Sequence, residues 1–228
     1  MSKGIFYCVG VGPGDPELMT FQAARIIREC PVAALPKSGS GENAAGKIAE
    51  ELLRDKELLL CDMPMTRDRA ALDAAHAEAA RQVARKLDEG RSVAFLTLGD
   101  PSIYATPMYL HHILKAQGYE TRMIPGVPSF CAVAAALDTS LCEGAERLQI
   151  IPASYPDAGE ALKEPGNKVL MKSGRSMGRV RAQIDRERFD AMAVECCGME
   201  GERIHRNLDT LEETASYFSV VVVKEKKG

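Results

Sequence analysis

Two short turns in this sequence place a carboxylate between a glycine and a proline. Gly14-Asp15-Pro16 and Gly99-Asp100-Pro101 each follow an apolar run and lead toward a helical pattern. Glycine allows the backbone to approach a ligand closely, whereas a carboxylate repels a phosphate at short range. The two turns therefore favour a ligand with hydroxyl groups or positive charge, such as a ribose, an ammonium group or a sulfonium.

The first of these turns lies in GVGPGDPELMT, residues 10–20, which does not satisfy a phosphate-binding motif. Its G-x-G-x-x-G spacing places Asp15 where the third glycine of a dinucleotide fingerprint belongs, and no G-K-[ST] follows. Asp15, Pro16 and Glu17 also form a good helix start, with a capping aspartate and a proline at the first position. Capping explains the aspartate but not the three glycines, so both interpretations stay open.

A third junction with glycine and proline is IPGVPSF, residues 124–130. Ser129 is suited equally to cap the helix that follows and to offer its hydroxyl to a ligand. Ligands of open α/β sheets bind outside the carboxyl ends of the strands. We therefore expect the turns that follow neighbouring strands to line one crevice.

The elements that must position these turns alternate between short β-rich runs and longer helical patterns. This order is typical of a mostly parallel sheet with helices on its faces. In the first half, the pattern predicts strands at 4–9, 31–35, 57–61, 92–98 and 119–124, and helices at 16–29, 43–54, 67–89 and 102–117.

The second half of the chain has a different pattern. It predicts helices at 129–137 and 175–186, and strands at 147–151, 167–171, 190–196, 202–207 and 217–224. Short connections such as GMEGE indicate antiparallel pairing there. A chain of 228 residues with 46% apolar residues also fits two cores of about a hundred residues each. We therefore predict an α/β fold with two domains, a mostly parallel sheet in residues 1–120 and a mixed sheet in residues 121–228.

Composition excludes several classes of partner. The net charge of -3 gives no global basic field for nucleic acid, and no stretch approaches the roughly 20 apolar residues of a membrane span. The seven cysteines form no C-x-x-C pair, which favours reduced thiols and a cytoplasmic protein. His111 and His112 are adjacent on a predicted helix and point about 100° apart, so we expect no metal site.

Together, the motifs VGVGPGDPELMT, LGDPSIY and IPGVPSF resemble those of the tetrapyrrole (corrin and porphyrin) methylases, in the same order. The likeness covers nearly the whole chain. Within that family, YCVGVGPGDPELMT, GDPSIYATPMY, IPGVPSFCAVAAAL and ERLQIIPA are most similar to the branch that methylates carbon 20 of precorrin-2 or cobalt-factor II. The resemblance implies a methyltransferase of cobalamin biosynthesis that uses S-adenosylmethionine.

The resemblance also implies a homodimer whose subunits each have two α/β domains, with the cofactor in a cleft between them. Matching the family motifs assigns cofactor contacts to Pro13, Leu98, Gly99, Asp100, Ile103, Pro128, Ser129, Met171, Gly198 and Ser219. The matches in the second domain are looser, because CCGM at 196–199 lacks the polar residue that the family usually carries before the glycine.

The implied chemistry requires little from side chains, because a sulfonium methyl group is already activated. Transfer to an electron-rich carbon is an in-line displacement that depends on alignment at about 3–3.5 Å. A base must later remove a proton, and water or a substrate carboxylate would serve as well as a side chain. Asp100, Tyr104 and Lys172 are the candidates for polar roles; turn formation, packing and a solvated strand end are the alternatives.

The implied substrate is a tetrapyrrole with many carboxylate groups, so cations should lie around its site. Lys37 in a Gly/Ser-rich loop, Arg67 in MPMTR and Arg175 in MKSGR are candidates, although each is also an ordinary surface charge. Two other functions stay open. One is a methylase for another tetrapyrrole carbon or for a protein substrate on the same scaffold; the other is a non-enzymatic ligand-sensing module.

Overall fold

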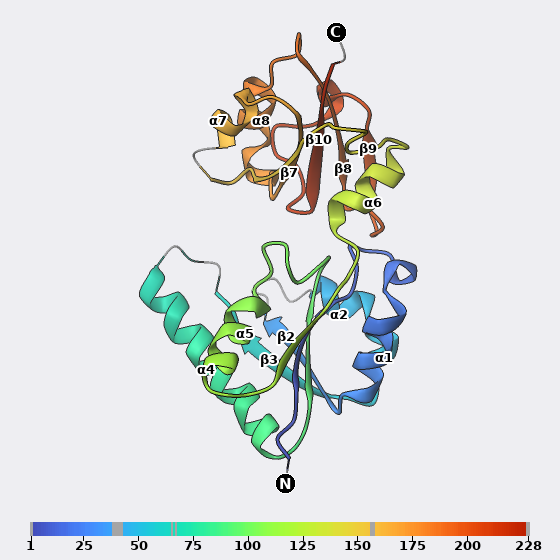
Figure 1. Ribbon diagram of the computed structural model, residues 1–228. Helices are drawn as coiled ribbons and strands as arrows, with labels where there is room; N and C mark the ends of the chain where they lie inside the picture. The colour runs from blue at the N-terminus through green and yellow to red at the C-terminus, as the bar shows by residue number, and fades with distance from the viewer. Residues whose placement is uncertain (1, 38–42, 65, 67, 156–157, 227–228) are drawn as a thin grey trace. The chain divides into compact units, whose positions relative to one another are not determined.

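The computed structural model describes residues 2–37, 43–64, 66, 68–155 and 158–226. The chain divides into two compact units, Met1–Pro128 and Ser129–Gly228 (Figure 1). The predicted boundary at residue 120 lies before strand β5 (Thr121–Ile124). Because β5 pairs with β1 (Phe6–Gly10), it belongs to the first unit, and the division comes eight residues later.

The first unit is built on a five-stranded sheet in the order β3-β2-β4-β1-β5. All of its pairs are parallel, as the sequence predicts. The remaining strands are β2 (Val32–Lys37), β3 (Glu57–Asp62) and β4 (Val93–Thr97). β1 lies between β4 and β5, so the three junction motifs leave the carboxyl ends of three adjacent strands.

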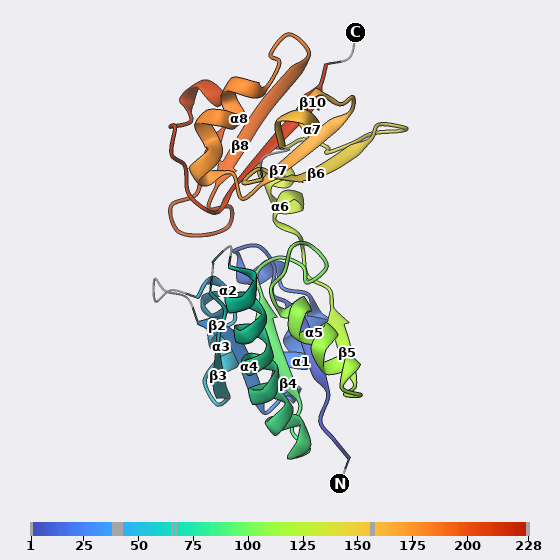
Figure 2. The same cartoon turned by 90° about the vertical axis from the view of Figure 1, so that its left-hand side faces the viewer.

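Helices cover both faces of this sheet (Figure 2), because successive side chains of each strand alternate between two apolar clusters. Tyr7 and Val9 pack on the side of α1 (Phe21–Glu29), α2 (Ala44–Ile48) and α3 (Glu50–Leu53). Phe6 and Cys8 pack on the side of α4 (Arg69–Asp88) and α5 (Pro107–Ala116). This is the doubly wound arrangement that buried parallel strands require.

Two predicted helices of this unit differ from the structure near their first residues. Residues 16–29 divide into the short 3-10 helix η1 (Pro16–Leu18) and α1, whose first turn is capped by Thr20. The helix predicted from residue 102 begins at Pro107, because Tyr104 adopts a left-handed conformation with φ 49° and proline favours the first helical position.

The second unit is built on a mixed sheet in the order β6-β7-β10-β8-β9. Its strands are β6 (Leu148–Pro152), β7 (Asn167–Met171), β8 (Phe189–Glu195), β9 (Arg203–His205) and β10 (Ser219–Glu225). β6 and β7 are parallel, whereas β10 is antiparallel to β7 and β8, and β9 is antiparallel to β8. The predicted antiparallel pairing of the closing strands is therefore confirmed, as is the two-part α/β fold.

Three α-helices accompany the described part of this sheet. α7 (Ala158–Lys163) and α8 (Met177–Gln183) pack on one apolar cluster with β7, β8 and β10, and α6 (Ser129–Ala136) contacts β8 and β10. The sequence predicts α6 and α8 but not the six-residue α7. No helix within the described residues of either unit combines the length and apolarity needed to span a membrane.

Candidate functional site

The three glycine junctions of the first unit meet at one edge of its sheet. Gly12 and Gly99 form an isolated antiparallel bridge, in which the Gly99 amide donates to the Gly12 carbonyl at 2.8 Å. Both glycines have positive φ, 85° for Gly12 and 70° for Gly99. The first and second turns are therefore joined through their main chains.

The third turn packs equally closely against the other two. A Cβ atom added to Gly126 would lie 2.2 Å from the Gly99 carbonyl oxygen, and one added to Gly10 would lie 2.5 Å from the same atom. Contacts of a Cβ atom shorter than 3.0 Å are almost never found in proteins. The glycines at these positions are thus required because three backbones touch one another, in addition to any approach that they allow to a ligand. We call Gly10, Gly12, Gly99 and Gly126 the glycine contact.

The carboxylate of Asp100 fastens the second turn to the third. Its Oδ1 accepts hydrogen bonds from the Ser102 amide at 2.8 Å and from the Ser102 hydroxyl, and its Oδ2 accepts from the Gly126 amide at 2.9 Å. Both oxygens therefore have partners within the protein. Asp100, which the sequence singles out for catalysis, is placed to shape the site.

Asp15, at the corresponding position of the first turn, has a simpler role. Its Oδ1 accepts from the Glu17 amide at 2.8 Å and caps η1, as the capping interpretation predicts. The turn is linked to the third junction through Thr20 instead. The Thr20 hydroxyl accepts from the Ala23 amide at 3.1 Å and donates to the Pro125 carbonyl at 3.1 Å.

The other predicted cofactor residues of the first unit follow these turns. Pro13 is buried beside the glycine contact, and Leu98 is half-buried against the apolar cluster of α1. The Ile103 amide donates to the Asp100 carbonyl at 3.2 Å, and Tyr104 is 47% exposed. An apolar surface next to a carboxylate is therefore present at this edge.

The remaining residues predicted for the site in this part of the chain do not take part in the glycine contact. Pro128 closes the first unit and Ser129 is the first residue of α6. Lys37 is exposed at the end of β2, one strand beyond β4. Arg67 lies outside the described residues.

The second unit has a corresponding edge where β6, β7 and β8 end in the same direction. Positive φ angles occur at Lys172, directly after β7 (57°), at Cys196, directly after β8 (51°), and at Gly198, two residues farther along (70°). Met171 is the last residue of β7, and Ser219 is the first of the antiparallel β10. Four of the residues predicted in this unit, Met171, Lys172, Gly198 and Ser219, therefore come from segments that end or begin at this edge.

The predicted residues at this edge differ in burial and in their hydrogen bonds. Burial lowers the pKa of the half-buried Lys172, so a neutral amine is available at lower pH than in free lysine. Gly198 is exposed, and its amide donates to Glu202 Oε2 at 2.6 Å. Ser219 is only 1% exposed, and its hydroxyl donates to the Ser216 carbonyl at 2.6 Å. Arg175 lies in the 3-10 helix η2 (Gly174–Ser176).

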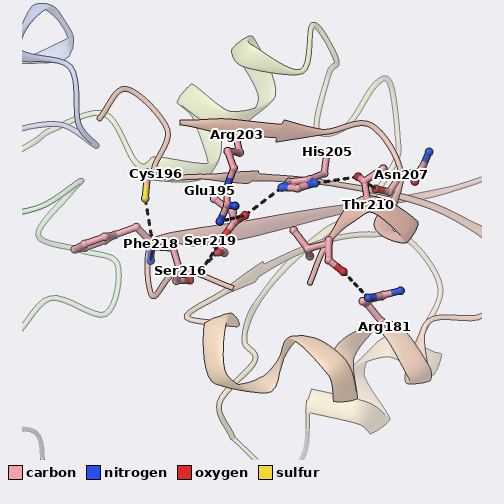
Figure 3. A network of polar contacts seen from close by, with 11 residues as sticks. Arg181, Glu195, Cys196, Arg203, His205, Asn207, Thr210, Ser216, Phe218 and Ser219 are labelled. Atoms are coloured by element: carbon pink, nitrogen blue, oxygen red, sulfur yellow. Dashed lines mark hydrogen bonds and ion pairs between the residues drawn. The ribbon is translucent and has the colours of Figure 1, made fainter. Parts of the chain in front are cut away.

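Sequence reasoning missed a group of polar residues at the same edge (Figure 3). Glu195, the last residue of β8, is buried and contacts His205 of β9 at 3.1 Å and the Ser216 amide at 2.7 Å. The signal for Glu195 was present, because a lone carboxylate closes the apolar run of a central strand. His205 carries no comparable signal, since it lies between Ile204 and Arg206.

No metal centre is indicated by the side chains that the structure describes. Within these residues, no group of three or more His, Cys, Asp or Glu is arranged to hold an ion.

Comparisons with known proteins identify the family of this chain and several relatives. Residues 6–213 match the family model described as Tetrapyrrole (Corrin/Porphyrin) Methylases. The cobalt-precorrin-2 C(20)-methyltransferase of Salmonella typhimurium is 29% identical, covering 98% of this chain and 98% of that protein. A probable cobalt-precorrin-2 C(20)-methyltransferase of Methanocaldococcus jannaschii is 30% identical, covering 97% and 96%.

A longer relative is also similar. The cobalamin biosynthesis protein CobIJ of Mycobacterium tuberculosis is 34% identical over 97% of this chain. The match covers 46% of CobIJ, so the chain spans slightly less than half the length of that relative.

Solved structures show the same fold at lower identity. Cobalt precorrin-4 methyltransferase CbiF has a TM-score of 0.76 and 18% identity, covering 96% of this chain and 94% of that one. Uroporphyrin-III C-methyl transferase from Thermus thermophilus, complexed with S-adenyl homocysteine, has a TM-score of 0.70 and 20% identity, covering 97% of both chains. The resemblance drawn from the three glycine junctions is thus confirmed, and the chain belongs to the tetrapyrrole methylase family.

Proposed function

We propose that this protein is an S-adenosylmethionine-dependent C-methyltransferase of cobalamin biosynthesis. Its substrate would be precorrin-2 or the cobalt-bound form, methylated at carbon 20. The observation that carries the proposal is the similarity, over nearly the full length of both chains, to two relatives named as C(20)-methyltransferases of cobalt-precorrin-2. Three of the four sequence motifs that favour the same branch include the turns of the glycine contact, and the fourth, ERLQIIPA, covers β6 of the second unit.

The residues of the first unit fit the proposed cofactor. S-adenosylmethionine supplies a sulfonium methyl group that is transferred by displacement. The half-buried Leu98 and the partly exposed Tyr104 offer apolar surface beside the carboxylate of Asp100, which suits an adenosyl group that carries positive charge. A phosphate would not fit as well, because Asp100 would repel it.

We assign contacts with the cofactor to the residues predicted from the family motifs. Between residues 13 and 129, these are Pro13, Leu98, Gly99, Asp100, Ile103, Pro128 and Ser129. Between residues 171 and 219, they are Met171, Gly198 and Ser219. The Ser219 hydroxyl and amide both donate to the Ser216 carbonyl, so Ser219 would contribute through its carbonyl oxygen. A contribution from both units remains a prediction.

Lys172 is the best candidate for a proton-transfer role among the three predicted residues. Burial lowers its pKa, so the neutral amine is reached at a lower pH than in free lysine; Asp100 instead uses its carboxylate to join the second and third turns. Tyr104 would contact the substrate or the cofactor at the exposed end of the second turn. Lys37, Arg67 and Arg175 are proposed to bind substrate carboxylates.

A homodimer and a cytoplasmic location complete the proposal. The family resemblance supports the homodimer, and the unpaired cysteines support the location. Light scattering of the purified protein would test the first.

The decisive experiment locates the transferred methyl group. The full chain is incubated with S-adenosylmethionine labelled with ¹³C at the methyl group, and with either precorrin-2 or its cobalt form, and the product is analysed by NMR. We expect one new methyl group at carbon 20, and the faster of the two reactions identifies the natural metal state.

The alternatives give different results in the same assay. A methyl group at another carbon would indicate a different tetrapyrrole methylase. No turnover and no thermal stabilisation by S-adenosylhomocysteine would favour a sensing module for another ligand. Binding at 100 times the dissociation constant should otherwise add about 2.7 kcal/mol to stability.

A further inference from the structure

The carboxylate of Glu195 is an unusual feature of the second unit, because its side chain is only 3% exposed. A buried charge is costly unless it is paired and hydrogen-bonded. Here the partners come from two different segments. Oε2 accepts from the Ser216 amide at 2.7 Å, while Oε1 lies 3.1 Å from His205 Nε2 and 3.0 Å from Arg203 Nη2. We call Glu195, Arg203, His205 and Ser216 the Glu195 cluster.

These contacts keep the carboxylate ionised. Burial alone would raise the pKa of Glu195, but the hydrogen bonds from Ser216 and His205 and the charge of Arg203 outweigh it, so the pKa lies below its usual value. An ionised carboxylate only accepts hydrogen bonds. His205 Nε2 therefore carries a hydrogen toward Glu195, and Nδ1 contacts Thr210 Oγ1 at 2.9 Å.

Ser216 extends the cluster to the start of β10. Its hydroxyl oxygen accepts from the Phe218 amide at 3.2 Å and contacts Cys196 Sγ at 3.3 Å. Its carbonyl accepts from both the amide and the hydroxyl of Ser219, at 3.1 and 2.6 Å. The Ser219 carbonyl in turn accepts from Ser173 Oγ at 3.2 Å. One continuous set of contacts thus leads from Glu195 to the residue that follows Lys172 (Figure 3 shows its central part).

The residue directly after Glu195 is held in a conformation that few residues adopt. Cys196 has φ 51°, in the left-handed region that favours glycine, and its amide donates to the Phe218 carbonyl at 3.2 Å. Such conformations persist where the surrounding structure fixes them. The path of the chain from Cys196 to Gly198 therefore depends on the segment that Ser216 anchors.

We propose that Glu195 is a positioning residue for the part of the cofactor site that the second unit supplies. Its carboxylate fixes the Ser216–Ser219 segment relative to the Cys196–Gly198 turn. This inference rests on the proposed function, because Gly198 and Ser219 are the residues of these segments assigned to the cofactor. Glu195 acts through them and does not itself touch the cofactor.

The chain offers a matched control at the other end of the same strand pair. In the β8–β10 register, Ser219 faces Glu195 and Glu225 faces Phe189. Glu225 also accepts from a backbone amide, that of Gly166 at 2.6 Å, and from an arginine, Arg188 Nη2 at 2.7 Å. It has the same kinds of partner at the opposite edge of the sheet, in a more exposed place, since its side chain is 32% exposed.

The test measures binding of S-adenosylhomocysteine to the full chain by isothermal titration calorimetry. A glutamine at 195 presents an amide hydrogen to at least one donor, so we expect Glu195→Gln to weaken binding about tenfold, which corresponds to about 1.4 kcal/mol. Glu225→Gln should stay within about twofold of wild type, even where it lowers the melting temperature. Hydrogen exchange should become faster in residues 196–199 and 214–219 of Glu195→Gln only.

Each outcome decides between the possible roles. If wild type binds and Glu195→Gln binds equally well, with unchanged exchange in both segments, the positioning role is wrong while the proposed function stands. If wild type does not bind, the proposed function and the cofactor role both fail, and exchange still shows whether Glu195 fixes the two segments.

A second variant covers the case in which Glu195→Gln does not fold. Ser216→Ala removes the hydroxyl that links Cys196 and Phe218 but leaves the buried charge and the Ser216 amide in place. We expect binding about threefold weaker than wild type, because one of the links is lost. Binding equal to wild type, with unchanged exchange at residues 196–199, would contradict the inference.

Discussion

The two units fix their candidate binding edges with different parts of the chain. The glycine contact of the first unit is made by main-chain atoms at the ends of β4, β1 and β5, and the side chains of Asp100 and Thr20 add links to the third turn. The Glu195 cluster of the second unit is centred on a buried charged side chain, which is held by the side chains of Arg203 and His205 and by the Ser216 amide. The first edge should therefore be sensitive to added volume, and the second to charge and protonation.

The strongest test of this comparison adds one methyl group to the glycine contact. Gly126→Ala would place a Cβ atom 2.2 Å from the Gly99 carbonyl oxygen and 2.8 Å from the Gly10 carbonyl carbon. We expect the free energy of unfolding to fall by about 3 kcal/mol or more, because backbone atoms cannot move aside as a flexible side chain can. Chemical denaturation measures the loss.

Gly118→Ala separates this clash from backbone strain. Gly118 has φ 83°, and nothing lies within 4 Å of an added Cβ atom. Its loss should be about 1–2 kcal/mol, from the left-handed conformation alone. Equal losses in the two variants would mean that the close contact between the turns has no energetic importance.

The next largest effect is expected at Lys172 in the second unit. If its amine transfers a proton, Lys172→Met should lower kcat about a hundredfold, within the usual range for general acid-base catalysis. The KM for S-adenosylmethionine should change little. Because burial lowers the pKa of Lys172, the rise of kcat with pH in wild type should begin below pH 10.5, the ordinary lysine pKa, and be absent from the variant.

Lys163→Met is the control, since Lys163 lies on α7 and its side chain is 71% exposed in an ion pair with Glu160. It should retain the wild-type rate. A wild-type kcat in Lys172→Met would instead identify Lys172 as an ordinary strand-end residue.

Acid should weaken the second edge through Glu195. The pKa of Glu195 is lower in the folded protein than its unfolded value of 4.5, so its stabilising contribution is complete above pH 4.5 and is lost as the pH falls through the folded value. At neutral pH, Glu195→Gln should reduce the free energy of unfolding by about 2 kcal/mol. The difference between wild type and variant should shrink below pH 4.5.

Denaturation with urea at a series of pH values measures this difference. A gap that stays constant down to pH 3 would contradict the role of the charge. Glu195 would then stabilise the fold only through its packing, and the contrast with the first unit would disappear.

The smallest expected effect compares the two Gly-Asp-Pro turns. Asp100→Asn turns an amide hydrogen toward either Ser102 or Gly126, so we expect a loss of about 1.5 kcal/mol in the free energy of unfolding. Asp15→Asn should lose less than about 0.5 kcal/mol, because asparagine caps a helix as well as aspartate does. Equal losses would show that the hydrogen bond to the third turn contributes little.

Most of the first unit could be predicted from the sequence, because β1, β2 and β4 are apolar runs with glycine or proline close to their ends. β4, for example, covers Val93–Thr97 against a prediction of 92–98. The start of α5 could not be predicted, because it depends on the left-handed conformation of Tyr104. α7 was missed because its six residues are too few to show helical periodicity.

The convergence of the three junctions followed from a general rule about parallel strands, but the bond from Asp100 to Gly126 did not. It requires β1 to lie between β4 and β5, and strand order cannot be read from these residues. The Glu195 cluster is harder still to predict. Its members are separated along the chain, and only the antiparallel register of β8, β9 and β10 brings them together.

The contact among Gly10, Gly99 and Gly126 also constrains the order of events during synthesis. The partners of Gly10 are added long after it leaves the ribosome, and they arrive with β4 and β5. Contacts between distant parts of a chain form slowly, and domains generally fold as units while synthesis proceeds. The amino-terminal edge therefore cannot assemble on the nascent chain until the residues around Gly126 have emerged from the exit tunnel.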